Sequence, residues 1–482
     1  MFCRKNQLEK YELVCGLETH IELSTKSKMF CPCKLEFGAR PNVNCCPVCT
    51  GAPGALPIIN QRAIRFAIMM GLALSCRINL FSQMERKNYF YPDLPKSYQI
   101  SQNENPLCTG GYVVLESGKR IRVNHIHIEE DAGKIKSEDG GIYIDYNRGG
   151  TPLIEIVSEP DIRGVRELCE YISFIQTTAR YLGISDVRMQ EGSLRCDVNV
   201  SIRLKESERL GVRVEIKNMN SIAFMAKAVE YEFKRQVGVI ESGEKLFQET
   251  RRYDDSLNIT QSMREKENVS DYLYFPDPDV QDIYIEKSEV EKIEKSMPEL
   301  PNQKLKRYTK DFGISKLVSE ILVKYSNPSK FLDKSSENAD QAVIIANWII
   351  GPVFSFLKTE SAKENFKIGI SCSEINKLAS LVIGKKISSS NAKKIIIKSL
   401  ENNLSLSELI KDYISSSISF DIEKICEEAI LNNKKAARDY INGKEKALQP
   451  ILGTVMAKTK GQANIVAAKD IIVNKLKLIT KI

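Results

Sequence analysis

Carboxylates and histidines of the kind that bind divalent cations recur on two segments of this 482-residue chain. In segment 11–23 the residues alternate, so that Glu18 and His20 lie on the face opposite the apolar side chains. The other two of the three histidines lie in NHIHIEEDAGK, beside Glu129, Glu130 and Asp131. Carboxylates with a neutral imidazole can hold Mg²⁺ or Mn²⁺. We therefore expect a cation site, although an isolated histidine is more often structural.

A second set of polar side chains lies in QEGSLRCDVNVSIRL, residues 190–204. Strand-like alternation from position 195 gives a polar face of Arg195, Asp197, Asn199, Ser201 and Arg203. The segment GVRVEIKNMNS follows after a short polar stretch, so the two segments predict a β-hairpin. Its second strand adds Arg213, Glu215 and Lys217 to the polar face.

Glu155, in RGGTPLIEIVSEPDI, takes the strand position opposite Ile154 and Ile156. A sheet face that mixes carboxylates, asparagine, arginine and lysine suits a ligand made of a metal ion and phosphate groups. The cations neutralise phosphoryl oxygens, and the carboxylates hold magnesium. A salt-bridged surface in contact with water has a similar composition.

Five of the thirteen cysteines lie between Cys31 and Cys49. The sequences CPC and CPVC form two close pairs that can converge on one tetrahedral zinc ion. Cys45 could replace Cys46, but only Cys46 gives the two-residue spacing of the second pair. Four thiolates fill the coordination shell, so the zinc would be structural; the alternative is a set of reduced, unpaired thiols. The predicted ligands are Cys31, Cys33, Cys46 and Cys49.

Composition narrows the class of protein. Hydrophobic residues at 42% and charged residues at 27% are typical of a soluble globular chain, and the net charge of +8 slightly favours an anionic partner. We find no membrane-spanning run and no signal peptide, and we expect a cytoplasmic location. The sequence contains no P-loop motif, no G-x-G-x-x-G and no G-x-S-x-G, so it offers neither of the common nucleotide-binding loops nor a serine nucleophile elbow.

The chain divides into an α+β region and a helical region. Residues 1–292 are rich in short β-type runs, which predicts an N-terminal cradle domain built on antiparallel sheet. One clear helix in this region ends at Gly183. Helical periodicity then continues to the C-terminus, which predicts an all-α helical domain at 293–405 and a small helical tail domain at 406–482.

Two serine-rich stretches, 386–391 and 413–420, mark expected breaks between helical bundles. The last 25 residues carry six lysines against one aspartate and predict a basic amphipathic helix. Such a helix could contact nucleic acid, or it could be a surface helix with extended lysines.

Eight motifs in this order resemble the tRNA-dependent amidotransferase B family, which comprises the B subunits of the aspartyl/glutamyl-tRNA amidotransferases. They cover nearly all of the first 290 residues, and the helical remainder resembles the family more loosely. The motifs are GLETHIEL, RKNYFYPDLPKSYQISQ, HIEEDAGK, NRGGTPLIEIVSEPDI, EGSLRCDVNVSIR, EIKNMNS, ETRRYD and DYLYFPDPD.

The resemblance implies an enzyme that converts mischarged Glu-tRNA(Gln) or Asp-tRNA(Asn) into the correct aminoacyl-tRNA. ATP with Mg²⁺ would phosphorylate the side-chain carboxylate, and ammonia would displace the phosphate. It also implies a heterotrimer, in which an amidase-type glutaminase subunit supplies ammonia and a small third subunit joins the two. The tail domain would bind tRNA.

The resemblance also implies residue roles. Glu18, His20 and Glu130 resemble the Mg²⁺ ligands, although strand parity equally allows Glu129. The zinc cysteines occur in only part of the family. Residues implied to complete the phosphate and metal environment are Arg195, Asp197, Asn199, Glu215, Lys217, Glu155 and Glu191, with Lys87 and Arg203 expected to contact the nucleotide.

Two other functions stay open at this point: a tRNA-binding scaffold subunit without chemistry, and a ligase that acts alone. The acidic side chains argue against the scaffold, because they repel nucleic acid unless a cation intervenes. The sequence does not decide between the two mischarged tRNAs.

Overall fold

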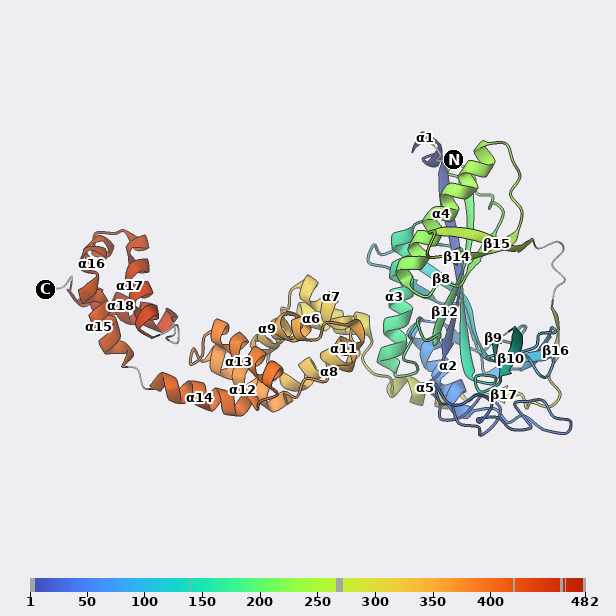
Figure 1. Cartoon of the computed structure of the whole chain (residues 1–482), viewed down its shortest axis with the longest axis horizontal. Helices are drawn as coiled ribbons and strands as arrows, with labels where there is room; N and C mark the ends of the chain where they lie inside the picture. The colour runs from blue at the N-terminus through green and yellow to red at the C-terminus, as the bar shows by residue number, and fades with distance from the viewer. Residues whose placement is uncertain are drawn as a thin grey trace. The chain divides into compact units, whose positions relative to one another are not determined.

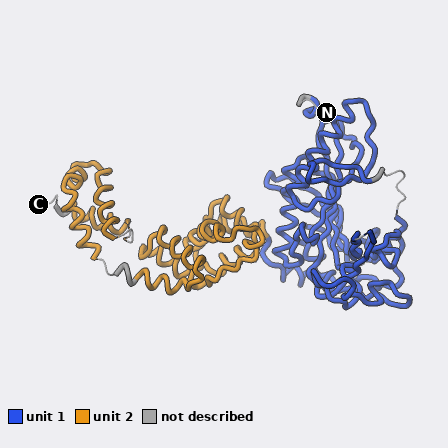
Figure 2. Tube along the Cα trace, in the orientation of Figure 1, with its two compact units in different colours: residues 1–300 blue, residues 301–482 orange. Residues whose placement is uncertain are grey.

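A computed structural model gives the architecture of residues 5–138, 140–265, 272–418, 421–459, 463 and 465–479, which are the residues that the structure describes. Contacts divide the chain into two units, Met1–Leu300 and Pro301–Ile482 (Figure 2). The boundary lies beyond the expected 292/293, because α5 (Lys287–Lys295) buries Ile293 in the core of the first unit.

The first unit is built around a ten-stranded sheet, which confirms the α+β class. Neighbouring strands run antiparallel apart from the parallel pair of β13 (Val214–Lys217) and β14 (Glu249–Asp254). β12 and β13 form the predicted hairpin, but β13 begins at Val214, so Arg213 is exposed and lies before the strand rather than on its polar face. The strand order is β15 (Ile259–Glu265), β14 (Glu249–Asp254), β13 (Val214–Lys217), β12 (Leu194–Leu204), β1 (Tyr11–Glu22), β11 (Pro152–Ser158), β8 (Arg120–Glu130), β6 (Cys108–Thr109) and β2 (Arg77–Ile78), with β7 (Tyr112–Val114) also paired to β8.

Helices α2 (Gln61–Ala73), α3 (Val165–Leu182) and α4 (Ile222–Glu241) pack on one face of this sheet (Figure 1). Their apolar side chains share one core with inward-facing strand residues such as Leu17 and Ile154. Because side chains alternate along a strand, burying one face in this core directs the polar residues of β1, β8, β11 and β12 to the other face. α3 ends at Gly183, as expected, with a left-handed φ of 67°.

Smaller elements complete the first unit. β4 (Glu85–Asn88) carries Lys87 and pairs with two neighbours in a three-stranded sheet. The remaining elements are α1 (Lys5–Leu8), the three-stranded sheet of β16 (Leu273–Pro276), β4 (Glu85–Asn88) and β5 (Tyr98–Ser101), the hairpin of β9 (Lys134–Glu138) and β10 (Gly141–Asp145), and the pair β3 (Phe81–Ser82) and β17 (Ile283–Tyr284).

The second unit is helical over the residues that the structure describes, as expected. Its elements are α6 (Pro301–Lys310), α7 (Lys316–Val323), α8 (Ser326–Ser335), α9 (Ala339–Trp348), the π-helix η1 (Ile349–Val353), α10 (Phe354–Phe356), α11 (Glu360–Asn365), α12 (Cys372–Ile383), α13 (Ser389–Asn402), α14 (Leu406–Ile418), α15 (Ile422–Asn432), α16 (Lys434–Ile441), the 3₁₀-helix η2 (Glu445–Ala447), α17 (Leu448–Lys458) and α18 (Ile465–Ile479).

Helices α15–α18 enclose a core of their own, in which Cys426 and Ile451 are buried. α14 packs instead against α12 and α13, and the Glu374 carboxylate at the start of α12 accepts hydrogen bonds from Ser405 and Ser407. The core that α15–α18 share therefore does not include α14, the first helix of the predicted tail domain at 406–482.

The stretch 386–391 lies where α13 begins after α12, but α14 packs against both helices, so the break predicted there does not separate two bundles. The break predicted at 413–420 agrees with the structure, since α14 ends at Ile418 and the separate core of α15–α18 begins after it; residues 419–420 lie outside the described part of the chain.

One stretch, Ala339–Phe356, is long and apolar enough to cross a membrane by length and composition, contrary to the expectation that none would be. Asp340 and Asn347 lie within it, and Pro352 sits in the π-helical turn. Nearly half of the stretch is buried among neighbouring helices of its own unit, which is the environment of a core helix.

Candidate active site

The polar face of the sheet carries a row of ionisable side chains across four adjacent strands. His20 on β1 lies opposite Glu155 on β11 and Arg195 on β12, and Glu155 lies opposite His127 on β8. Glu18, two residues earlier on β1, lies opposite Asp197. Residues directly opposite on one face lie close enough for their side chains to interact. The register therefore gathers residues that are far apart in the sequence.

One cluster in this row has the composition of a cation site. One ligand atom from each of His20, Glu129 and Glu155 lies within 4.8 Å of the other two. His20 Nε2 is 3.2 Å from Glu155 Oε2 and 3.6 Å from Glu129 Oε1. His127 Nε2 approaches the same carboxylates at 3.3 and 3.4 Å. Oxygen and imidazole donors of this kind fit Mg²⁺ or Mn²⁺.

The cluster retains protons in the cation-free chain. Burial alone would lower the pKa of His20, but Glu155 and Glu129 outweigh it and raise this pKa to about 9. The same balance raises the pKa of His127 to about 10. Burial lowers the pKa of His125, which stacks on His127, to about 4. Two buried carboxylates are thus neutralised by two imidazolium groups, and a bound cation would take over that role.

We expect the affinity for Mn²⁺ to rise between about pH 6.5 and about pH 8.5. A cation must displace the protons that the raised pKa values hold on His20 and His127, so affinity should increase about tenfold per pH unit for each proton displaced. Isothermal titration calorimetry checks this, and an affinity independent of pH would contradict it. Without a cation, the stabilisation from the two imidazolium groups is present below about pH 6.5 and lost as the pH rises through about 9 to 10.

A second cluster, Glu18, Asp197 and Glu215, lies beside the first. Burial and the nearby charge of Glu155 raise the pKa of Glu18. Asn199 Nδ2 donates to Glu18 Oε1 at 2.8 Å. The ammonium group of Lys217 bridges Asp197 and Glu215, at 3.0 Å from the latter. This cluster therefore contains carboxylates, an amide and a cation, as the hairpin predicted.

Glu215 receives a further hydrogen bond that sequence reasoning missed. The Thr250 hydroxyl on β14 donates to Glu215 Oε2 at 2.9 Å. β14 follows α4 and joins β13 in the parallel pair. No local pattern in the sequence gives the partner of β13, so Thr250 could not be found in advance.

Of the two adjacent glutamates on β8, Glu129 and not Glu130 belongs to the histidine cluster. Glu130 points to the opposite face, where it accepts a hydrogen bond from the Ile100 amide at 3.1 Å and pairs with Lys96. The prediction of Glu130 as a ligand beside His20 is therefore wrong. His127 and Glu129 share a face because they are two residues apart, and the pairing of His127 with Glu155 makes this the face that joins the site.

Lys87 on β4 lies next to this cluster. Burial opposes its charge, but the carboxylates of Glu129 and Glu155, together with neighbouring tyrosines, raise the pKa of Lys87. Its ammonium also lies 4.8 Å from the ring centroid of Tyr272. A cation held here is suited to contact an anionic ligand.

A third group connects the face to the loop before β11. Arg195 Nη2 donates to Asp131 Oδ2 at 2.6 Å and lies 4.0 Å from Glu22. Arg148 Nε is 3.4 Å from the same Asp131 oxygen. Arg148 was not predicted, and Asp131 was named only as one of the carboxylates beside the two histidines.

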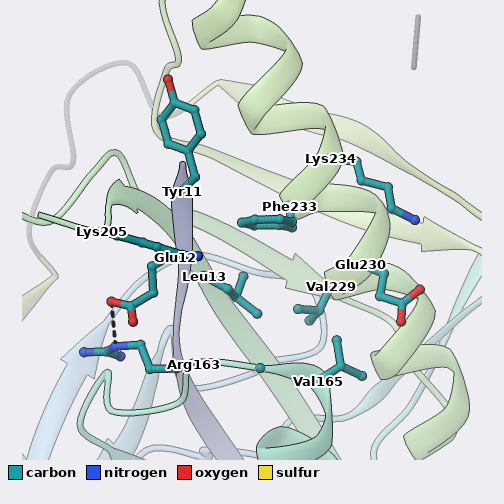
Figure 3. A pocket seen from close by; sticks show the side chains of 11 residues that line it. Tyr11, Glu12, Leu13, Arg163, Val165, Lys205, Val229, Glu230, Phe233 and Lys234 are labelled. Carbon is teal, nitrogen blue, oxygen red and sulfur yellow. Dashed lines mark ion pairs between the residues drawn. The ribbon is translucent and has the colours of Figure 1, made fainter. Parts of the chain in front are cut away.

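Two predicted residues lie away from this face's centre. Glu191 is exposed in a turn before β12, where it pairs with Arg188 at 2.8 Å. Arg203 lies near the far end of β12 and pairs with Glu12 at 2.7 Å. Glu12 also pairs with Arg163 at 3.4 Å, and both line a separate pocket of about 340 Å³ between β1 and α4 (Figure 3).

The four predicted zinc ligands, Cys31, Cys33, Cys46 and Cys49, come together with their sulfur atoms within 4.8 Å of one another. Hydrogen bonding from Cys31 lowers the pKa of Cys49 to about 4, while burial raises that of Cys33 to about 11. Cys45 is not part of the group, and its sulfur lies 3.9 Å from Asn147 Oδ1. The arrangement fits a tetrahedral structural zinc.

Fold and site together define an α+β protein with carboxylates and histidines clustered on one sheet face, followed by a helical unit. Residues 13–291 match the family described as "GatB/GatE catalytic domain", and residues 330–476 match "GatB domain". A B subunit of the aspartyl/glutamyl-tRNA(Asn/Gln) amidotransferase of Clostridium acetobutylicum is 43% identical over 97% of this chain and 99% of its own length. The corresponding B subunits of Caldicellulosiruptor saccharolyticus and Thermodesulfovibrio yellowstonii are 43% and 42% identical, over 98% and 97% of this chain and all of their own length.

The chain therefore belongs to the family of aspartyl/glutamyl-tRNA(Asn/Gln) amidotransferase B subunits.

Proposed function

We propose that this chain catalyses the ATP-dependent amidation of mischarged Glu-tRNA(Gln), Asp-tRNA(Asn) or both. A carboxylate oxygen of the mischarged amino acid attacks the γ-phosphorus of ATP, and ADP leaves. Ammonia then adds to the acyl phosphate carbonyl, and phosphate leaves as the amide forms. The observation that carries the proposal is the convergence of His20, Glu129 and Glu155 beside lysine and arginine side chains on one sheet face.

The residues of this face have distinct roles in the proposal. His20, Glu129 and Glu155, with Glu18 and Asp197 beside them, would hold Mg²⁺, which would offset charge on the transferred phosphoryl group. Cationic side chains would contact the phosphoryl oxygens, and the remaining polar groups would orient them. These cationic and orienting residues are Arg195, Lys217, Lys87, Asn199 and Glu215.

The proposal includes partners that this chain does not itself supply. Ammonia would come from an amidase-type glutaminase subunit, and a small third subunit would complete a heterotrimer. The helical tail would bind tRNA through its lysines, in a cytoplasmic complex. A structural zinc would occupy the four-cysteine cluster.

The alternative is a scaffold subunit that binds tRNA without chemistry. The clustered carboxylates argue against it, because carboxylates within 4.8 Å of one another on a face meant for RNA would repel phosphate unless a cation bridged them. ATP hydrolysis by the assembled complex should be stimulated by mischarged tRNA and not by correctly charged tRNA. Asp197→Ala should abolish this stimulation, whereas, if this chain were only a scaffold, the complex would hydrolyse ATP equally with and without the substitution.

We expect Arg203→Ala to change the rate of amidation by no more than about threefold. Arg203 pairs with Glu12, which keeps Arg163 as a partner after the substitution, so no buried charge is left unpaired. Steady-state amidation at saturating ATP measures the effect. A decrease of more than about tenfold in the amidation rate would contradict this and would support the predicted contact of Arg203 with the nucleotide.

A further inference from the structure

Lys28 is one of the largest fully buried side chains of the first unit, with 1% of its surface exposed. A buried ammonium group is stable only with anionic or hydrogen-bonding partners. Lys28 Nζ lies 3.5 Å from Cys49 Sγ and donates to the Tyr146 carbonyl oxygen at 3.0 Å. One of its two partners is thus a sulfur of the four-cysteine cluster.

The backbone of Lys28 contacts the other half of the same cluster. Its amide donates to the Cys33 carbonyl oxygen at 3.0 Å, and the amide of Met29 donates to the Gly150 carbonyl oxygen at 2.7 Å. Lys28 therefore contacts Cys33 of the CPC sequence, Cys49 of the CPVC sequence and Tyr146 of the loop before β11. Gly150, at φ +85°, lets that loop approach, since a Cβ there would lie 3.3 Å from Lys28 Cδ.

Charge explains why a lysine is buried here. Four thiolates around Zn²⁺ carry a net charge of −2, which is costly to bury without a neighbouring cation. An ammonium group on one thiolate offsets half of that charge. Cys31 and Cys49 are themselves buried, so little of this compensation can come from solvent.

The loop that Lys28 contacts also contacts the polar face of the ten-stranded sheet, which is called the active face here. Beyond Tyr146, Arg148 Nε donates to the Ala132 carbonyl oxygen at 3.0 Å and lies 3.4 Å from Asp131. Asp131 in turn pairs with Arg195 at 2.6 Å. A continuous set of contacts thus runs from Cys49 through Lys28 and Arg148 to Arg195.

We propose that Lys28 is a positioning residue that stabilises zinc in the four-cysteine cluster and, through the 146–150 loop, fixes Arg195 on the active face. The second half of this inference rests on the proposed function, because it takes Arg195 as part of the amidation site. The first half concerns zinc alone.

The test compares Lys28→Met with Lys34→Met in the complex assembled with its partner subunits. Lys34 is an exposed lysine that pairs with Glu36, and it directly follows Cys33 of the four-cysteine cluster. It is therefore a matched control. Zinc transfer to a chromogenic chelator should be about 10- to 100-fold faster in Lys28→Met and unchanged in Lys34→Met. Amidation with free ammonia should fall as zinc is lost and recover when zinc is added.

If Lys28→Met does not fold, Lys28→Gln takes its place in the test, because glutamine keeps a hydrogen-bond donor but not the charge. Lys28→Gln should show the same faster transfer of zinc. Equal zinc release from the Lys28 and Lys34 variants would overturn the role at zinc, as would a wild-type complex without zinc. Zinc loss with undiminished amidation would overturn the link to Arg195. A wild-type complex that holds zinc but does not amidate would instead refute the proposed function.

Discussion

Glu155→Gln is expected to lower the rate of ATP-dependent amidation at least about 100-fold. Glu155 lies within 3.3 Å of both His20 and His127, so the neutral amide removes the charge that the two imidazoles and a bound cation share. The change preserves the size of the side chain, and the register of β11 should not move. Single-turnover amidation with saturating ATP and free ammonia measures the effect on chemistry.

The matched control is Glu230→Gln, the same substitution at an exposed position of α4. It should leave the rate unchanged within about twofold. Equal rates for the Glu155 and Glu230 variants would place the phosphoryl-transfer chemistry elsewhere.

Cys49→Ala is expected to remove zinc from a chain that otherwise holds about one zinc ion, and to lower the midpoint of thermal unfolding. Three thiolates remain, and the free energy of metal binding that contributed to folding is lost. Elemental analysis gives the zinc content, and circular dichroism gives the unfolding midpoint.

Cys45→Ala provides the control, because Cys45 lies next to the cluster but outside it. Its zinc content should match that of the wild type. If both cysteine variants retained zinc equally, the assignment of the four ligands would be wrong.

Alternation along single strands carried most of the site prediction. The faces of β1, β11 and β12 follow from period 2, and the structure places Glu18, His20, Glu155 and Asp197 on one face accordingly. The same rule left Glu129 and Glu130 open, because it does not say which face of β8 joins the site. Only the pairing of His127 with Glu155 decides it.

Alternation along a strand also predicts which side chains share a face, but it does not predict that they lie close to one another. Arg203 shares the face of Arg195, but eight residues of strand separate them by about 26 Å. The contacts of Thr250 and Arg148 depend on long-range pairing, which a single sequence does not encode locally. The burial of Ile293 in the core of the first unit is likewise a tertiary contact.

Oxygen transfer from the substrate to phosphate tests the central claim most directly. Mischarged tRNA would carry ¹⁸O in the side-chain carboxylate of its amino acid, and the complex would convert it with ATP and free ammonia. If this sheet face activates the carboxylate by phosphorylation, the inorganic phosphate released will contain one ¹⁸O atom for each amide formed. Amide formation with unlabelled phosphate would contradict the account.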